Sequence, residues 1–332
     1  MKPKVLIAPA PLKEIEAVYA PQLRAAGLEV VFPARTAQMS EADLLDQLPG
    51  CSASLAGSEP YTRKVIEIAA KAGLKVIARA GVGYDAVDLA AATEHGVAVC
   101  FAPGTNQDAV AEHALMLVLA LSKSLILQHE QVKLGHWPRR MYEPIRGRTL
   151  GIVGMGRTGK AVAERAAAFN MNLIGSDPVW DDTFAAKHRV KRVELDELFS
   201  TSDIVTLHVP HTPITRKMIN ARTLGLMKPT AFLVNTARGP VIDEAALYEA
   251  LAAKRIAGAG LDVFVDEPPL GSPLLTLNNV VVTAHTAGVD AQSLRDMARV
   301  AAESIAALMT GEWPADRIVN ADVKTVWKRS PG

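Results

Sequence analysis

A glycine-rich turn near the middle of the chain is the feature that most constrains its fold. Gly154, Gly156 and Gly159 follow an apolar stretch at 150–153 and precede a stretch of helical character at 160–169. Between a strand and a helix, this spacing is typical of a turn that binds a dinucleotide. The first glycine permits the tight turn, the second lets backbone approach a pyrophosphate, and the third lets the helix pack near the strand. A domain-sized segment precedes this turn and has to be explained.

A carboxylate at the end of the next predicted strand strengthens this interpretation. Asp177 lies 18 positions after Gly159, close to the spacing of about 20 residues at which an acid binds the ribose hydroxyls of NAD. The same carboxylate would repel the 2′-phosphate of NADP, and Asp181 and Asp182 are acidic too. The sequence therefore predicts an NAD site, with NADP less favoured. A turn that serves packing alone is the alternative.

Composition excludes several other classes of protein. A length of 332 residues suggests about two domains. The net charge of +1 gives no electrostatic reason to expect nucleic acid or an anionic membrane as a partner. Two cysteines, Cys51 and Cys100, are too few for a disulfide framework, so we expect a reducing, cytoplasmic location and no metal site. Pro9 and Pro11 interrupt the N-terminal apolar run well short of a signal peptide.

Short apolar stretches alternate with helical stretches along most of the chain. The predicted strands lie at 5–8, 28–32, 53–56, 75–78, 97–100, 149–153, 172–176, 203–208, 230–235, 258–263 and 280–283. Long helices are expected at 108–127 and 288–309, and the apolar stretch 114–121 within the first is too short to span a bilayer. Such alternation predicts βαβ units and parallel sheets, which is an α/β fold.

Polar residues follow three of the later predicted strands. Arg238 follows the strand at 230–235, Asp262 ends the next one with Glu267 shortly after it, and His285 follows the last. Ligands of open α/β sheets bind at this edge. An arginine can hold a substrate carboxylate, a histidine can exchange a hydroxyl proton near neutral pH, and a carboxylate can fix the histidine ring. Taken singly, Arg238 could instead be a surface cation, Glu267 a solvated loop acid, and His285 a hydrogen-bonded histidine that closes a strand.

Several motifs in the same order make the chain resemble the D-isomer-specific 2-hydroxyacid dehydrogenases. They span nearly the whole sequence and lie at 79–85, 103–106, 110–113, 154–159, 208–215, 235–239, 262–268 and 283–288. The resemblance implies two Rossmann-like or flavodoxin-like domains with parallel sheets. A nucleotide domain at 102–286 would be inserted into a discontinuous substrate domain at 1–101 and 287–332, and the cleft between them would close on the substrate.

The resemblance also implies roles for individual residues. Arg238 would bind and polarise the substrate, His285 would be the general acid and base, and Glu267 would orient His285. Substrate contacts would come from Arg238 together with Ser58, Val82 and Gly83. The cofactor contacts would be Gly154, Gly156, Arg157, Thr158, Gly159, Asp177, Val209, Pro210, Thr215, Thr236, Ala237, Asp262 and Gly288. The family is usually dimeric, and the helix at 114–121 matches the interface element, although a simple core helix is an equally good interpretation.

The substrate is predicted less sharply than the reaction. The motifs most resemble phosphoglycerate dehydrogenases, many of which carry an arginine just after the third strand. Here the stretch after the third strand, residues 56–60, contains no arginine and carries an acid, Glu59. The chain also ends soon after its last helix, which would leave no room for a regulatory domain. We therefore expect a small unphosphorylated acid such as glyoxylate or hydroxypyruvate. The alternatives are phosphoglycerate oxidation, phosphite oxidation, or an NAD-sensing corepressor that binds partners.

Overall fold

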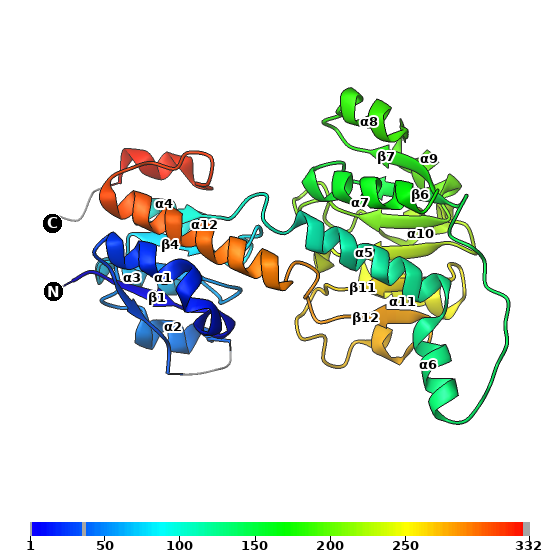
Figure 1. Cartoon of the computed structure of the whole chain (residues 1–332), viewed down its shortest axis with the longest axis horizontal. Helices are drawn as coiled ribbons and strands as arrows, with labels where there is room; N and C mark the ends of the chain where they lie inside the picture. Colours follow the sequence, from blue (N-terminus) through cyan, green and yellow to red (C-terminus); the bar gives the residue numbers. More distant parts are fainter. Residues whose placement is uncertain (1, 35–37, 328–332) are drawn as a thin grey trace. The chain divides into compact units, whose positions relative to one another are not determined.

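A computed structural model describes residues 2–34 and 38–327 and shows an α/β chain with two parallel sheets, as the alternating pattern predicts (Figure 1). Contacts divide the chain into two units. Unit 1 comprises Met1–Asn106 and Asp290–Gly332, and unit 2 comprises Gln107–Val289. The divisions expected from the sequence lie at 101/102 and 286/287, a few residues before these two points.

The sheet of unit 1 has five parallel strands in the order β2-β1-β3-β4-β5, one of the common orders of doubly wound folds. Alternate residues of β1 and the position that follows it enter two separate cores: Val5 and Ile7 face one, and Leu6 and Ala8 the other. The strands are β1 (Lys4–Ile7), β2 (Glu29–Val31), β3 (Ala53–Ala56), β4 (Val76–Arg79) and β5 (Ala98–Cys100).

Helices cover both faces of this sheet. One core is shared with α1 (Glu16–Ala25) and α12 (Ala291–Thr310), and the other with α2 (Glu41–Gln47), α3 (Arg63–Lys71) and α4 (Leu89–Glu94). Side-chain caps begin most of these helices, as where Ser40 accepts from Asp43 N–H in a capping box. Two short 3-10 helices complete the unit, η1 (Ala10–Ile15) and η4 (Ala321–Thr325).

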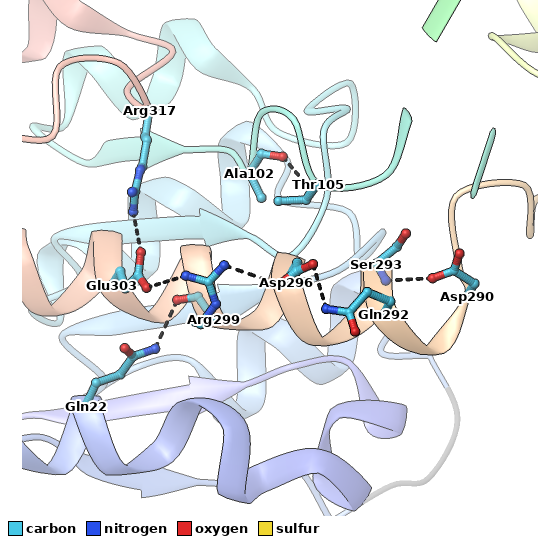
Figure 2. Close-up of polar contacts among 10 residues, drawn as sticks. All are labelled: Gln22, Ala102, Thr105, Asp290, Gln292, Ser293, Asp296, Arg299, Glu303 and Arg317. Carbon is cyan, nitrogen blue, oxygen red and sulfur yellow. Dashed lines mark hydrogen bonds and ion pairs between the residues drawn. The ribbon is translucent and has the colours of Figure 1, made fainter. Parts of the chain in front are cut away.

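Within unit 1, polar contacts of α12 and the chain after it join the C-terminal segment to the first hundred residues (Figure 2). Gln22 of α1 donates to the Arg299 carbonyl at 3.0 Å, and Arg317 pairs with Glu303 at 2.9 Å. Beyond the helix, Asn320 accepts from Val99 N–H at 2.9 Å, so the returning chain extends the hydrogen bonding of β5. The first hundred residues therefore need this distant segment to complete their core.

The sheet of unit 2 has seven parallel strands in the order β12-β11-β10-β9-β6-β7-β8. The chain proceeds outward from β6 in one direction and then returns to β9 on its other side, which makes the β6–β9 boundary the switch point where such sheets bind ligands. The strands are β6 (Thr149–Val153), β7 (Asn172–Ser176), β8 (Val190–Arg192), β9 (Ile204–Leu207), β10 (Phe232–Asn235), β11 (Gly258–Leu261) and β12 (Val280–Val282).

Helices again cover both faces of the sheet, each with its own core. On one face lie α5 (Gln107–Ser122), α7 (Arg157–Ala168) and α8 (Asp182–His188). On the other lie α9 (Leu195–Thr201), α10 (Ala221–Leu226) and α11 (Glu244–Ala252). The short η2 (Gly239–Val241) and η3 (Pro273–Thr276) occupy loops.

The prediction of a single helix at 108–127 is wrong. The chain forms α5 and then a separate α6 (Leu125–Lys133), bent by 59°. Ser124 adopts the left-handed conformation with φ +47°, which ends the first helix, and the Gln128 amide donates to the Lys123 carbonyl there. Among the described residues no single helix is long and apolar enough to cross a bilayer, and α5 with α6 passes only as a bent pair, by length and composition.

Candidate functional site

Two loops of unit 2 touch at the switch point of its sheet. Gly154 follows β6 with φ +93°, a conformation that side chains rarely adopt. A Cβ on Gly154 would lie 2.6 Å from the carbonyl oxygen of His208, the first residue after β9. Glycine is therefore required here for both conformation and space.

The other two glycines of the turn serve different purposes. A Cβ on Gly159 would lie 1.9 Å from the Gly154 carbonyl oxygen, so Gly159 brings α7 against the turn. A Cβ on Gly156 would meet nothing within 4 Å. Gly156 caps α7 without a side-chain hydrogen bond, and Arg157 and Thr158 form the first turn of that helix. Free helical N–H groups beside open space fit a bound pyrophosphate.

Asp177 follows β7 and holds the backbone on both sides. Its Oδ2 accepts from Met155 N–H and its Oδ1 from Val179 N–H, both at 2.7 Å. Each carboxylate oxygen has a second lone pair, so two acceptors remain for a ribose diol. Nearby, Lys160 pairs with Asp181 at 2.5 Å, which partly neutralises this lysine.

Two buried polar atoms without a hydrogen-bond partner in the described part of the chain lie after β9 and β10. They are Nδ1 of His208 and Oγ1 of Thr236. Burial lowers the pKa of His208 to about 3, so its ring is neutral, and its Nε2 lies 2.9 Å from Thr206 Oγ1. Such atoms are costly unless a ligand or water binds them, which again fits a polar cofactor at this edge. Thr215 closes the loop between these strands by donating to the Pro210 carbonyl at 2.6 Å, with Val209 at its start.

The loop after β10 carries Arg238. The Asn235 side chain accepts from Ala237 N–H at 3.0 Å and donates to the Arg238 carbonyl at 2.9 Å, which fixes the backbone on both sides of Thr236. A Cβ on Gly239 would lie 1.9 Å from the carbonyl carbon of Phe264. This loop therefore packs directly on the backbone of the loop that leads to Glu267.

Glu267 and His285 are joined by a hydrogen bond. Nδ1 of His285 lies 2.6 Å from Oε2 of Glu267, and both side chains are partly exposed. The other carboxylate oxygen accepts from Phe264 N–H at 3.0 Å. Partial burial would raise the pKa of Glu267, but the hydrogen bonds from His285 and Phe264 and the charge of His285 outweigh it and lower that pKa. The glutamate therefore stays ionised at neutral pH and binds the ring at its Nδ1 atom.

Asp262 is almost completely buried and organises the loop that carries His285. Its Oδ1 accepts from Thr283 Oγ1 at 2.6 Å and Thr286 N–H at 2.9 Å, and its Oδ2 accepts from Ala287 N–H at 2.9 Å. His285 N–H donates to the Asp262 carbonyl at 2.8 Å, and His285 is left-handed with φ +51°. The carboxylate expected to line the cofactor site is thus used inside the protein, and Gly288 lies just beyond this loop.

The predicted substrate residues of unit 1 lie at the carboxyl edge of its sheet. Ser58 follows β3, and Val82 and Gly83 follow β4. The buried Arg79 donates from Nε to the Gly83 carbonyl at 2.8 Å. Glu59 is also buried and accepts from Gly57 N–H at 2.6 Å. Two opposite charges therefore hold the two loops that contain these residues.

Some residues with evident structural roles escaped prediction. Glu244 begins α11 and accepts from Val265 N–H at 2.7 Å, which anchors the Glu267 loop from the far side. His113 of α5 lies 2.8 Å from Thr283 Oγ1. Both contacts join residues far apart in the sequence, so no local spacing could reveal them. The sequence indicated only that His113 and Thr283 belong to two of the motifs shared with the dehydrogenase family, at 110–113 and 283–288.

Comparisons with known proteins identify the family of the chain. Residues 115–287 match the model of the "D-isomer specific 2-hydroxyacid dehydrogenase, NAD binding domain". The D-3-phosphoglycerate dehydrogenase of Methanocaldococcus jannaschii is 44% identical over 78% of this chain, which spans only 49% of that relative's length. The glyoxylate reductase of Korarchaeum cryptofilum is 40% identical, with 87% and 88% of the two chains covered. The solved structure of the TT0316 protein from Thermus thermophilus has a TM-score of 0.84 and 36% identity, covering 95% of this chain and all of that one.

Replacing the two glycines of the turn separately should distinguish folding from cofactor binding. Gly159→Ala forces a backbone clash and should lower the free energy of unfolding by roughly 2 kcal/mol or more. Gly156→Ala meets no protein atom, so it should leave unfolding unchanged and weaken NADH binding about tenfold or more. Thermal denaturation and fluorescence titration with NADH measure the two effects. Equal NADH affinity for Gly156→Ala and the unmodified protein would contradict a cofactor at this turn.

Proposed function

Because the chain belongs to the D-isomer specific 2-hydroxyacid dehydrogenase family, we propose that it transfers a hydride between NAD and a small D-2-hydroxy acid or 2-keto acid. Glyoxylate and hydroxypyruvate are the substrates we favour. The observation that carries the proposal is the 2.6 Å pair of His285 and an ionised Glu267, at the sheet edge where the Arg238 loop also lies. These groups provide proton transfer and carboxylate recognition in one unit.

The residues divide the work as follows. The His285 ring uses Nδ1 for Glu267, which leaves Nε2 as the nitrogen that gives or takes the hydroxyl proton of the substrate. Glu267 fixes the tautomer and orientation of the ring by accepting a hydrogen bond from its Nδ1. Arg238 holds the substrate carboxylate and polarises the carbonyl, with backbone N–H groups near Val82 and Gly83 as further carboxylate donors. Bound nicotinamide supplies or accepts the hydride.

The cofactor is held by the glycine-rich turn, the first residues of α7, Asp177 and the loops after β9 and β10. Gly156 and the first turn of α7 would hold its pyrophosphate, and the remaining lone pairs of the Asp177 carboxylate would accept from the adenosine ribose hydroxyls. A 2′-phosphate would meet that carboxylate at close range, so we propose NAD over NADP. Ala237 and Gly288 would add further cofactor contacts.

An unphosphorylated substrate is supported by the charges at the edge of unit 1. Burial raises the pKa of Glu59, although hydrogen bonds from backbone N–H groups and the charge of Arg79 oppose that effect. Neither form of this carboxyl supplies the cation that a phosphate requires. Arg79 itself donates a hydrogen bond to the Gly83 carbonyl and interacts electrostatically with Glu59. The loop after β3 therefore suits a neutral substrate tail better than an anionic one.

We further propose a cytoplasmic homodimer. An exposed hollow of about 600 Å³ on α5, α6 and α7 has an apolar floor that includes Leu115, Met116, Leu119, Leu125 and Phe169, and it is also lined by the charged residues Glu112, Lys123 and Arg165. Met116 is 44% and Leu125 55% exposed, and an apolar surface continues along α6. Such a contiguous patch on a protein of ordinary charge fits a second copy of the chain. Both cysteines are free and buried, which fits a reducing compartment.

A panel of 2-keto acids with NADH and NADPH tests the central proposal. We expect turnover of glyoxylate or hydroxypyruvate with NADH, and a lower kcat/KM with NADPH. His285→Ala should lower kcat by about 10²- to 10⁴-fold because proton transfer is lost, and Glu267→Gln should lower it less. NADH affinity should stay within about twofold in both variants. His95→Ala, which changes a histidine of unit 1, serves as the matched control. Absence of turnover for every acid in the panel would refute the assignment.

The choice between phosphorylated and unphosphorylated substrates depends on Glu59. The unmodified enzyme should favour hydroxypyruvate over 3-phosphohydroxypyruvate in kcat/KM. Glu59→Gln removes the negative charge beside Arg79 and should narrow this ratio about tenfold, which corresponds to about 1.4 kcal/mol. Glu29→Gln makes the same change at the opposite edge of the sheet and should leave the ratio unchanged. A preference for the phosphorylated acid in the unmodified enzyme would favour phosphoglycerate oxidation instead.

The dimer is tested by placing charge in the apolar hollow. Met116→Lys with Leu125→Lys should convert a dimer into a monomer, as measured by size-exclusion chromatography with light scattering. Ile68→Lys alters a residue of α3 that is 41% exposed and should leave the mass unchanged. If the unmodified chain is a monomer at micromolar concentration, the hollow is not a dimer interface.

A further inference from the structure

A second histidine of unit 2 lies behind the loop that carries His285. His113 projects from α5, and its Nε2 lies 2.8 Å from Thr283 Oγ1 and 3.5 Å from Asp262 Oδ1. Its side chain is only 14% exposed and that of Asp262 only 1%. The three residues come from a helix, the end of β11 and the end of β12. They form a continuous polar chain that ends at the backbone on either side of His285.

The directions of these hydrogen bonds follow from the available protons. The Thr283 hydroxyl has one proton, and it donates that proton to Asp262 Oδ1 at 2.6 Å. The Thr283 hydroxyl oxygen has no second proton to give, so it can only accept a hydrogen bond from His113. Nε2 of His113 must therefore carry a hydrogen. His113 thus acts as a donor that orients Thr283 and faces the buried carboxylate. Asp262 in turn accepts from Thr286 N–H and Ala287 N–H and binds His285 N–H through its carbonyl oxygen.

We propose that His113 is a positioning residue for the general acid and base His285, acting through Thr283 and Asp262. This inference rests on the proposed dehydrogenase function. The left-handed backbone of His285 is a conformation that few residues adopt without support from their surroundings. The donor on α5 keeps Asp262 in the orientation in which it binds the amides of residues 286 and 287. Loss of that donor should loosen the loop without removing any group that touches substrate or cofactor.

The experiment compares two substitutions of His113. His113→Leu removes the donor, whereas His113→Gln can place an amide N–H near the position of Nε2. We expect His113→Leu to lower kcat about tenfold with little change in the KM for NADH, and His113→Gln to recover most of the loss. Glu112→Gln, on the same helix but exposed, is the control. Equal losses in His113→Leu and His113→Gln would overturn the proposal.

A double-mutant cycle tests the route. Thr283→Val breaks the chain at its middle, so adding His113→Leu to it should cause little further loss of kcat. Losses that multiply would show that His113 does not act through Thr283 and would overturn the proposal.

Hydrogen exchange gives a measurement that does not depend on activity. Amides of residues 285–287 should exchange faster in His113→Leu and return towards the unmodified rate in His113→Gln. Faster exchange in a chain that reduces no 2-keto acid would refute the proposed function and support the positioning role. Unchanged exchange and unchanged kcat in an active enzyme would refute the positioning role alone.

Discussion

The buried carboxylate of Asp262 is the interaction on which the rest of the site depends. It lies at the end of β11, between the strand that precedes Arg238 and the strand that precedes His285. A buried carboxylate is tolerated only when its oxygens are hydrogen-bonded, and leaving one unpaired costs several kcal/mol. Asp262 meets this requirement with the hydroxyl of Thr283 and the amides of residues 286 and 287. The hydrogen bonds that a single buried acid requires thereby determine the conformation of the His285 loop.

Close backbone contacts transmit this order to the neighbouring loops. Gly239 packs against the carbonyl of Phe264, and Gly154 packs against the carbonyl of His208, at distances that exclude any side chain. The loops after β6, β9, β10 and β11 are therefore positioned by main chain against main chain. Such contacts have little freedom to adjust, because peptide groups are rigid and tightly packed. This rigidity is what a site that must place a proton donor and an arginine for one small substrate requires.

The sequence predicted the α/β architecture well because strand and helix periods differ and glycine turns have specific conformational demands. Local patterns were also sufficient to predict that Gly154, Gly156 and Gly159 form a turn between a strand and a helix. They likewise predicted that Arg238, Glu267 and His285 follow strands. They failed where a single backbone angle decided the outcome, as at Ser124, whose left-handed conformation ends α5 within an otherwise helical pattern. They also missed β8, a three-residue strand whose Lys191 and Arg192 are exposed and carry no apolar alternation.

Buried acids show most clearly where sequence reasoning ends. Asp177, Asp262 and Glu59 all follow parallel strands, and the sequence predicted cofactor contacts for the first two and an acid unfavourable to phosphate for the third. In the structure Asp177 keeps two free lone pairs, whereas Asp262 is almost wholly occupied by its own loop. Glu59 is buried and holds Gly57 N–H. Asp177 and Asp262 each accept from two backbone amides, and what separates them is burial: Asp177 is partly exposed, whereas Asp262 is almost completely buried and also accepts from the Thr283 hydroxyl. That difference depends on the path of the following loop, which places Thr283 between Asp262 and His113.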